Sequence, residues 1–114
     1  MRKDPLSRGL ALTLVCAFAA SAQAADIFTL PPELWDRPRS ARAVLEQPAV
    51  KRALNLHLAQ PGSRLVIHHG HGQDPLAQAE ELRAWLMALA IDGARISLAN
   101  DVKAPEALNI EVVK

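Results

Sequence analysis

The chain has 114 residues, half of them hydrophobic, and its 13 Lys and Arg against 12 Asp and Glu leave a formal net charge of +1. This length suits one small domain. The near balance of charge argues against nucleic acid or an anionic membrane as the main partner, because both favour a basic face that neutralises phosphates.

The first 24 residues have the composition of a secretory signal peptide. They begin with three basic residues, Arg2, Lys3 and Arg8. An apolar run over 9–20 follows, and the small residues of 21–24 form a cleavage site of the A-x-A type. The run is too short to span a bilayer. We expect residues 1–24 to be removed, and residues 25–114 to form a single periplasmic domain with no membrane span.

Cys16 offers a second interpretation of this segment, as a lipoprotein signal. Val15 stands where that signal needs a small residue, so we favour cleavage after Ala24. Cleavage there removes the only cysteine, together with three basic residues and one acidic residue, and leaves 10 Lys and Arg against 11 Asp and Glu. The mature chain then has no disulfide, no thiol nucleophile and no cysteine ligand for a metal.

The first predicted elements after the signal are a short edge strand and a loop. The β-prone run 26–30 ends at Pro31 and Pro32, because two successive prolines cannot donate the hydrogen bonds of a sheet. Residues 33–39 are predicted to form an ordered loop anchored by the indole of Trp35. We interpret Trp35 as a packing residue rather than a ligand platform.

A helical segment is predicted over 41–59. Ser40 is placed to cap its start, and Pro48 is expected to kink the helix or to make it restart. Pro61 and Gly62 end the segment. Beyond Pro48, five side chains fall on one stripe that we expect to face the core. These are Val50, Ala53, Leu54, His57 and Leu58.

The β-branched run 64–69 is predicted to be a central strand that leads into a second helix. Asp74 followed by Pro75 is a typical helix start, in which the carboxylate accepts backbone amide protons. We expect this helix to run to about Ile91, with Gly93 supplying the left-handed residue that closes it.

Two short alternating segments, 95–98 and 108–112, are predicted to be strands, separated by a turn at Asn100 and Asp101 and by Pro105. The order strand, helix, strand, helix, strand, strand defines an α/β (α+β) sandwich. In this fold class two helices pack on one face of a small mixed sheet of three or four strands. Right-handed crossovers place both helices on the same side.

The second predicted helix and the strand after it resemble the C-terminal domain family of outer-membrane protein A (OmpA), which is similar to peptidoglycan-associated lipoproteins and flagellar motor stator domains. The residues at the family's spacing are Ala79, Leu82, Leu86, Ile91, Arg95 and Ile96. The order of the upstream helix, its proline-glycine end and the apolar strand follows the family as well. The resemblance implies an OmpA-C-like β-α-β-α-β-β fold in the cell envelope, with peptidoglycan or an envelope protein as partner.

The ligand site that the resemblance implies is altered in this chain. The family grips a zwitterionic diaminopimelate with an Asp just past the central strand and an Arg at the start of the second helix. Here the positions read His69 and Gln78. A neutral amide cannot replace the bidentate contact of a guanidinium with a carboxylate, and Arg83 lies too far along the helix to do so. We expect the peptidoglycan site to be altered or lost.

A histidine cluster gives the alternative function, a periplasmic metal-binding protein. On an extended backbone His69 and His71 share a face while His68 points to the other. Two imidazoles, with Asp74 as a further ligand, are candidates for Zn²⁺ or Cu²⁺, and His68 is included in the candidate set. We favour the competing interpretation, in which one histidine packs under the helices and the others are solvated. Proton transfer by a histidine stays open.

These observations favour a noncatalytic binding or interaction domain of the periplasm. No motif places a serine or cysteine nucleophile beside a histidine, and the sequence has no phosphate-binding loop. Glu80 and Glu81 are interpreted as a solvated helix face, because neighbouring positions rarely converge on one substrate. A small hydrolase is the third and least favoured hypothesis.

Overall fold

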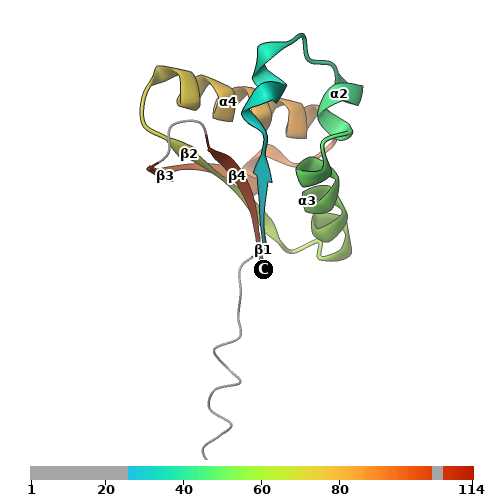
Figure 1. The fold of residues 1–114 in the computed structure, drawn as a ribbon. Coiled ribbons are helices and arrows are strands. Elements are labelled where there is room, and N and C mark those ends of the chain that lie inside the picture. The colour runs from blue at the N-terminus through green and yellow to red at the C-terminus, as the bar shows by residue number, and fades with distance from the viewer. Residues whose placement is uncertain (1–25, 104–106) are drawn as a thin grey trace, which may run out of the picture.

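The computed structural model describes residues 26–103 and 107–114, so the predicted signal peptide and Pro105 lie outside the described residues. The described residues form one four-stranded sheet with three helices packed against it (Figure 1). The strands are β1 (Asp26–Leu30), β2 (Arg64–Gly70), β3 (Ile96–Val102) and β4 (Leu108–Val113). The helices are α2 (Ala41–Leu45), α3 (Pro48–Ala59) and α4 (Gln73–Ala88), with 3-10 turns η2 (Pro32–Asp36) and η3 (Gly93–Arg95). Within the described ranges, no helix combines the length and the apolar character needed to cross a membrane.

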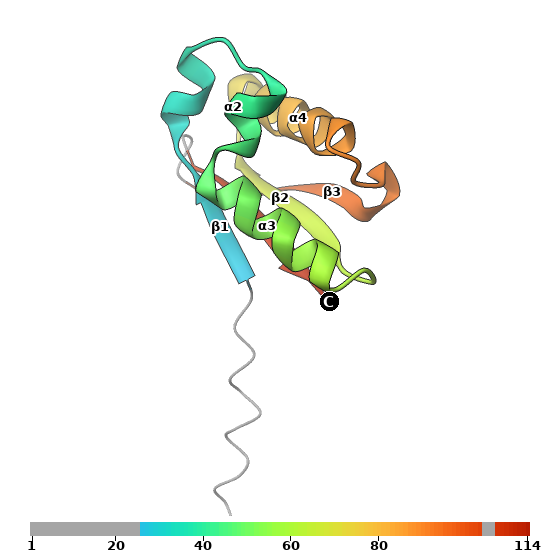
Figure 2. The ribbon, with the colours of Figure 1, turned by 90° about the vertical axis from the view of Figure 1, so that its right-hand side faces the viewer.

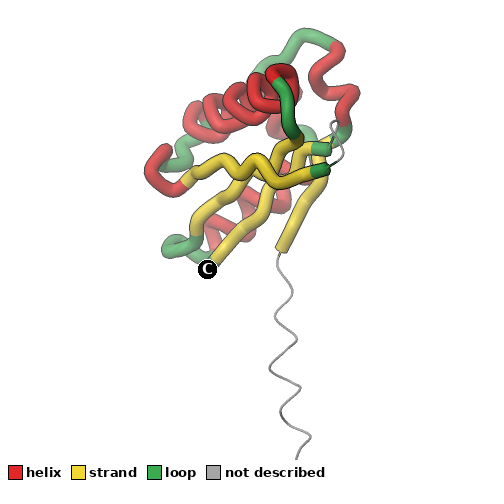
Figure 3. The backbone as a smooth tube through the Cα atoms, turned by 90° about the vertical axis from the view of Figure 1, so that its left-hand side faces the viewer, coloured by secondary structure: helices red, strands yellow, loops and turns green. Residues whose placement is uncertain are grey.

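The sheet is mixed and has the strand order β1-β4-β2-β3. β4 runs antiparallel to both β1 and β2, whereas β2 and β3 are parallel neighbours. Parallel neighbours need a crossover connection, which α4 supplies. The last strand, β4, then returns to the middle of the sheet, which leaves β1 and β3 as the two edges (Figure 3).

The two longer helices lie on the same face of the sheet (Figure 2). α3 packs mainly over β1 and β4, and α4 packs over β2 and β3. The predicted fold class, with helices on one face of a small mixed sheet, is therefore confirmed. Because antiparallel pairs tolerate solvent on one side, the sheet is stable with its opposite face uncovered by any described element.

Alternation along the central strands decides which side chains enter the core. Leu65 and Ile67 of β2 and Ile110 of β4 are fully buried beneath the helices. Their sequence neighbours Val66 and Glu111 point to the uncovered face and are half-buried. The helices contribute further fully buried side chains to the same core, namely Val50, Ala53, Ala79, Leu82 and Leu86.

The start of the first helical segment agrees with its sequence signals. The hydroxyl oxygen of Ser40 accepts a hydrogen bond from the backbone N–H of Ala43 at 3.1 Å, which confirms the predicted cap. α2 ends at Leu45 and α3 begins with Pro48, so the segment restarts where the proline cannot continue the preceding helix.

The ends of α4 differ from the prediction. The helix begins at Gln73 after Gly72, which has φ of 107°, and no side chain caps it, so the predicted Asp74 cap is wrong. α4 ends at Ala88, and the left-handed residue that follows is Ala90, with φ of 79°, rather than Gly93. The chain turns out of the helix early because the N–H of Ile91 bonds the carbonyl of Leu86, which brings the 5% exposed Ile91 side chain into the core.

Two segments predicted to be irregular are regular. Asn100 and Asp101 continue β3 rather than form a turn, because pairing with β2 extends through them. The predicted loop over 33–39 contains the 3-10 helix η2, whose Leu34 is 2% exposed and anchors the segment in the core. The sequence prediction placed the anchor one residue later, at Trp35, which is only half-buried.

The stripe on α3 also ends earlier than predicted. Leu54 is 9% exposed, whereas Leu58, one turn later, is 71% exposed. Ala49 is buried in its place, at the start of the helix, so the stripe that meets the sheet runs from Ala49 to His57.

The two leucines allow a matched test of this packing. We expect Leu54→Ala to lower the free energy of unfolding by about 2–4 kcal/mol, because it leaves a cavity in the core. Leu58→Ala should change it by less than about 1 kcal/mol, since the side chain is already in solvent. Urea unfolding followed by circular dichroism measures both variants. Equal losses would mean that Leu58 is buried and that α3 is rotated relative to the sheet.

Candidate functional site

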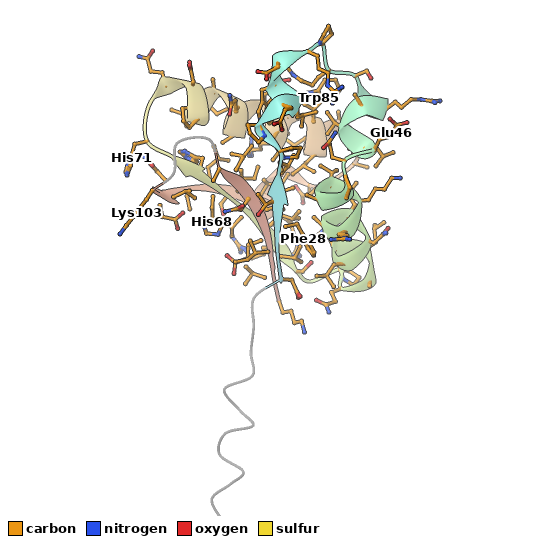
Figure 4. All side chains as sticks on the ribbon, viewed as in Figure 1. Phe28, Glu46, His68, His71, Trp85 and Lys103 are labelled. Atoms are coloured by element: carbon orange, nitrogen blue, oxygen red, sulfur yellow. The ribbon has the colours of Figure 1, made fainter. Side chains whose placement is uncertain are left out.

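The structure separates the three clustered histidines. His69 points into the core and is 4% exposed, and its Nδ1 donates to the carbonyl of Gly70 at 2.9 Å. His68 lies on the opposite, uncovered face of the sheet, as the alternation predicts. His71 is exposed in the bend after β2 (Figure 4), so it lies outside the strand on which a face shared with His69 was predicted.

This separation bears on the metal-binding hypothesis. Within residues 26–103 and 107–114, no group of three or more His, Cys, Asp or Glu side chains is placed to hold a metal ion. Asp74, the further ligand considered, is exposed in the first turn of α4. The Zn²⁺ or Cu²⁺ hypothesis therefore gains no support from the geometry of these residues.

His68 is instead held between two carboxylates from the neighbouring strands. Its Nδ1 lies 2.8 Å from Oδ1 of Asp101 on β3, and its Nε2 lies 2.7 Å from Oε1 of Glu111 on β4. The side chains of His68 and Glu111 are 20% and 21% exposed, against 56% for Asp101. The cluster therefore joins three strands on the uncovered face.

The hydrogen-bond partners favour the protonated form of this histidine. An ionised carboxylate accepts hydrogen bonds but does not donate them, so both bonds form together only when both ring nitrogens of His68 carry a proton. Partial burial lowers the pKa of His68, but the hydrogen bonds and negative charges of Asp101 and Glu111 outweigh it and raise the pKa above its ordinary value. Folding therefore favours the imidazolium form of His68.

The double engagement limits what His68 can do chemically. A general base or a metal ligand needs an unprotonated ring nitrogen, and both nitrogens of His68 donate to carboxylates. The cluster is thus built to hold three strands in register and to respond to pH. The proton-transfer hypothesis for His68 gains no support from this arrangement.

A second ion pair anchors the segment before α2 to α4. Nε and Nη2 of Arg39 donate to the two carboxylate oxygens of Glu81, at 2.7 and 2.9 Å. The indole N–H of Trp85 donates to the same carboxylate at 3.0 Å, and the guanidinium lies 5.4 Å from the ring centroid of Trp35. Glu81 is therefore engaged in packing, and its interpretation as solvated helix surface is wrong. Trp35 supports Arg39, which agrees with its interpretation as a packing residue.

A serine and a histidine do meet in the structure, which bears on the hydrolase hypothesis. Ser63 Oγ and His57 Nδ1 are 2.7 Å apart at the end of α3. Ser63 also lines a cavity of about 280 Å³, but it is only 1% exposed and His57 only 9%. In the described chain no carboxylate bonds the other nitrogen of His57. The pair lacks the accessible nucleophile and the orienting acid of a hydrolase triad.

The two positions implied by the family resemblance do not form a charged pair. His69 is sealed in the core, and Gln78 is half-buried on α4. Neither supplies a carboxylate or a guanidinium. Arg83 does not compensate, because its Nη2 donates to the carbonyl of Gly93 at 3.0 Å and fixes the turn before β3.

A cavity of about 320 Å³ opens on another part of the described surface, between β1 and the start of α3. Its lining mixes apolar and polar residues, and one of them is charged. The lining residues are Ile27, Phe28, Thr29, Pro31, Gln47, Pro48, Ala49 and Arg52. We call this feature the β1–α3 groove. Sequence reasoning did not identify it, because it joins residues from separate elements.

Comparison of the chain with protein-family models, with curated proteins and with solved structures found no match.

The His68 cluster predicts a pH-dependent stability. Because the pKa of His68 is raised on folding, its stabilisation is complete below the unfolded value of about 6.5 and is lost as pH rises through the folded value. We expect the excess stability of the wild-type chain over His68→Asn to shrink as pH rises from below the unfolded value through the raised, folded pKa. Chemical unfolding at each pH, with His71→Asn as the control, measures this. A constant difference would show that His68 does not titrate against the two carboxylates.

The Arg39 pair predicts the opposite dependence at acid pH. The hydrogen bond from Arg39, helped by that from Trp85, lowers the pKa of Glu81 below 4.5. Its stabilisation is therefore complete above pH 4.5 and is lost as pH falls through the lowered pKa. We expect Glu81→Gln to unfold at lower urea than wild type at neutral pH, and the gap to close on acidification. Glu80→Gln, on the exposed neighbour, should behave like wild type at both pH values.

Proposed function

We propose that this chain is an exported, noncatalytic interaction domain of the cell envelope whose fold resembles the OmpA C-terminal family. The signal-like segment 1–24 supports export to the periplasm. The element order β-α-β-α-β-β of the described residues agrees with the order that the resemblance implies. Its partner is a protein of the envelope, or peptidoglycan bound in a different way from the family's.

One observation supports the proposal that the ligand of this chain differs from that of the family. At the positions where the family grips diaminopimelate with opposite charges, this chain has a core histidine, His69, and an amide, Gln78. A buried imidazole engaged with a backbone carbonyl is not available to a cell-wall peptide. A zwitterion would therefore find neither charged partner there, and the usual contact would be lost.

A noncatalytic role is supported by the way the polar clusters are used. His68 has both nitrogens engaged with carboxylates, and Ser63 is sealed from solvent beside His57. The Arg39 and Glu81 pair holds two segments together. These groups stabilise the folded structure, whereas catalysis needs groups that can contact a substrate.

Two measurements test the proposal. The full-length gene product, expressed in a Gram-negative cell, should be recovered from the periplasm with an intact mass that lacks residues 1–24. The purified protein should not sediment with peptidoglycan sacculi at low salt, under conditions where a known peptidoglycan-binding domain does. Recovery of the chain in the cytosol with Met1 attached would overturn export. Sedimentation that Gln78→Ala abolishes would show that the family's contact is retained.

A further inference from the structure

The β1–α3 groove has the backbone of an edge strand as one of its walls. Three consecutive β1 residues, Ile27, Phe28 and Thr29, line the cavity, although successive side chains of a strand point to opposite faces. Their shared feature is the main chain, so the free edge of β1 opens directly onto the groove. The first turns of α3 form the other wall, where Figures 1 and 2 show it beside β1.

Among the described residues, β1 is an edge strand. It pairs there with β4 alone, so alternate N–H and C=O groups point outward without a sheet partner in the described chain. Edge strands are usually blocked by charges, prolines or bulges. β1 has a single charge, at its first residue, Asp26, and Ile27 is 51% exposed. The opposite edge differs, because the pairing of β3 shifts register beside Gly70.

The chemistry of the groove indicates what it accepts. Phe28 and Pro31 offer apolar contacts, and Thr29 and Gln47 are polar residues of the same lining. Arg52 is the single charged residue that lines it, and in the described residues no ion pair engages this guanidinium. The exposed Lys51 lies next to it in the sequence, so this part of α3 is basic. An extended segment with a negative group is therefore the complementary ligand.

We propose that the β1–α3 groove binds an extended segment of a partner protein, which adds a fifth strand to the sheet beside β1 and places a carboxylate on Arg52. Five residues of β1 extend over roughly 17 Å, so the segment needs five or six residues in strand conformation. Backbone hydrogen bonds to the edge supply affinity, and alternate apolar side chains fill the groove. The inference rests on the proposed function and names the chemistry of its partner.

The test selects peptides against the purified full-length chain from two random eight-residue libraries, one with free and one with amidated carboxyl ends. Selected peptides should alternate β-branched or aromatic residues and carry a carboxylate. Enrichment from the amidated library assigns the carboxylate to an Asp or Glu side chain, and enrichment from the free library alone assigns it to the chain terminus. Binding of the best peptides should slow hydrogen exchange of those β1 amides that point away from β4, but not of the amides of β3.

The charge contact has a matched pair of variants. Arg52→Glu should weaken peptide binding about tenfold or more, as loss of a charge-assisted hydrogen bond does. Lys51→Glu changes an exposed neighbour that does not line the groove, and it should bind within about twofold of wild type. Circular dichroism verifies that both variants fold. Equal binding by wild type and Arg52→Glu, or selection of basic peptides, would overturn the proposal.

Two further outcomes would also overturn it. A lack of any enriched peptide would mean that the groove does not accept a strand. A peptide-free dimer in sedimentation, with the outward-pointing amides of β1 already protected, would assign the edge to a second copy. Neither outcome touches the proposed function, which stands or falls on the location of the chain and on its behaviour with sacculi.

Discussion

The constraint on which this structure depends is the two-residue period of its central strands, β2 and β4. Each strand sends alternate side chains under the helices and the others to the uncovered face. Leu65, Ile67 and Ile110 form the floor of the core, and His68 and Glu111 stand on the other side. A slip of one residue in either strand would put charges in the core and leucines in solvent, so burial on one face specifies the register.

The same register creates the polar features of the uncovered face. His68 meets Asp101 and Glu111 only because β3 and β4 flank β2 on its two sides. The contacts span three strands whose pairing is part parallel and part antiparallel, so they stabilise only this arrangement of the sheet. The histidine is thereby committed to holding the fold together. For this reason a residue type associated with catalysis and metal binding serves a structural purpose here.

The proposed binding of a partner then depends on surface groups that the described fold leaves without a partner. The return of β4 to the middle of the sheet puts β1 at an edge, and α3 covers the inner face of β1 without closing that edge. The groove between them combines backbone groups of an edge strand, a mixed apolar and polar lining and the cation of Arg52. At the opposite edge, by contrast, the shift of register beside Gly70 makes strand addition less favourable. This difference between the two edges favours β1 over β3 as the strand to which a partner segment adds.

The sequence by itself determined the order of the elements, the cap at Ser40, the restart at Pro48 and the face on which the helices pack, because these depend on local dihedral preferences and on periodicity. It also showed that His68 and His69 point to opposite faces. The start and end of α4 were predicted wrongly, because a core contact of Ile91 overrides the glycine signal at its end. Leu58 was predicted to be buried, because an apolar stripe shows which side of a helix faces the core but not where the sheet beneath the helix stops.

Only the tertiary structure decided that Asp101 and Glu111 enclose His68, that Arg39 reaches Glu81 from 42 residues away, and that β1 and α3 form a groove. Those contacts join residues distant in the chain, and they exist only once the sheet has fixed which strands are neighbours.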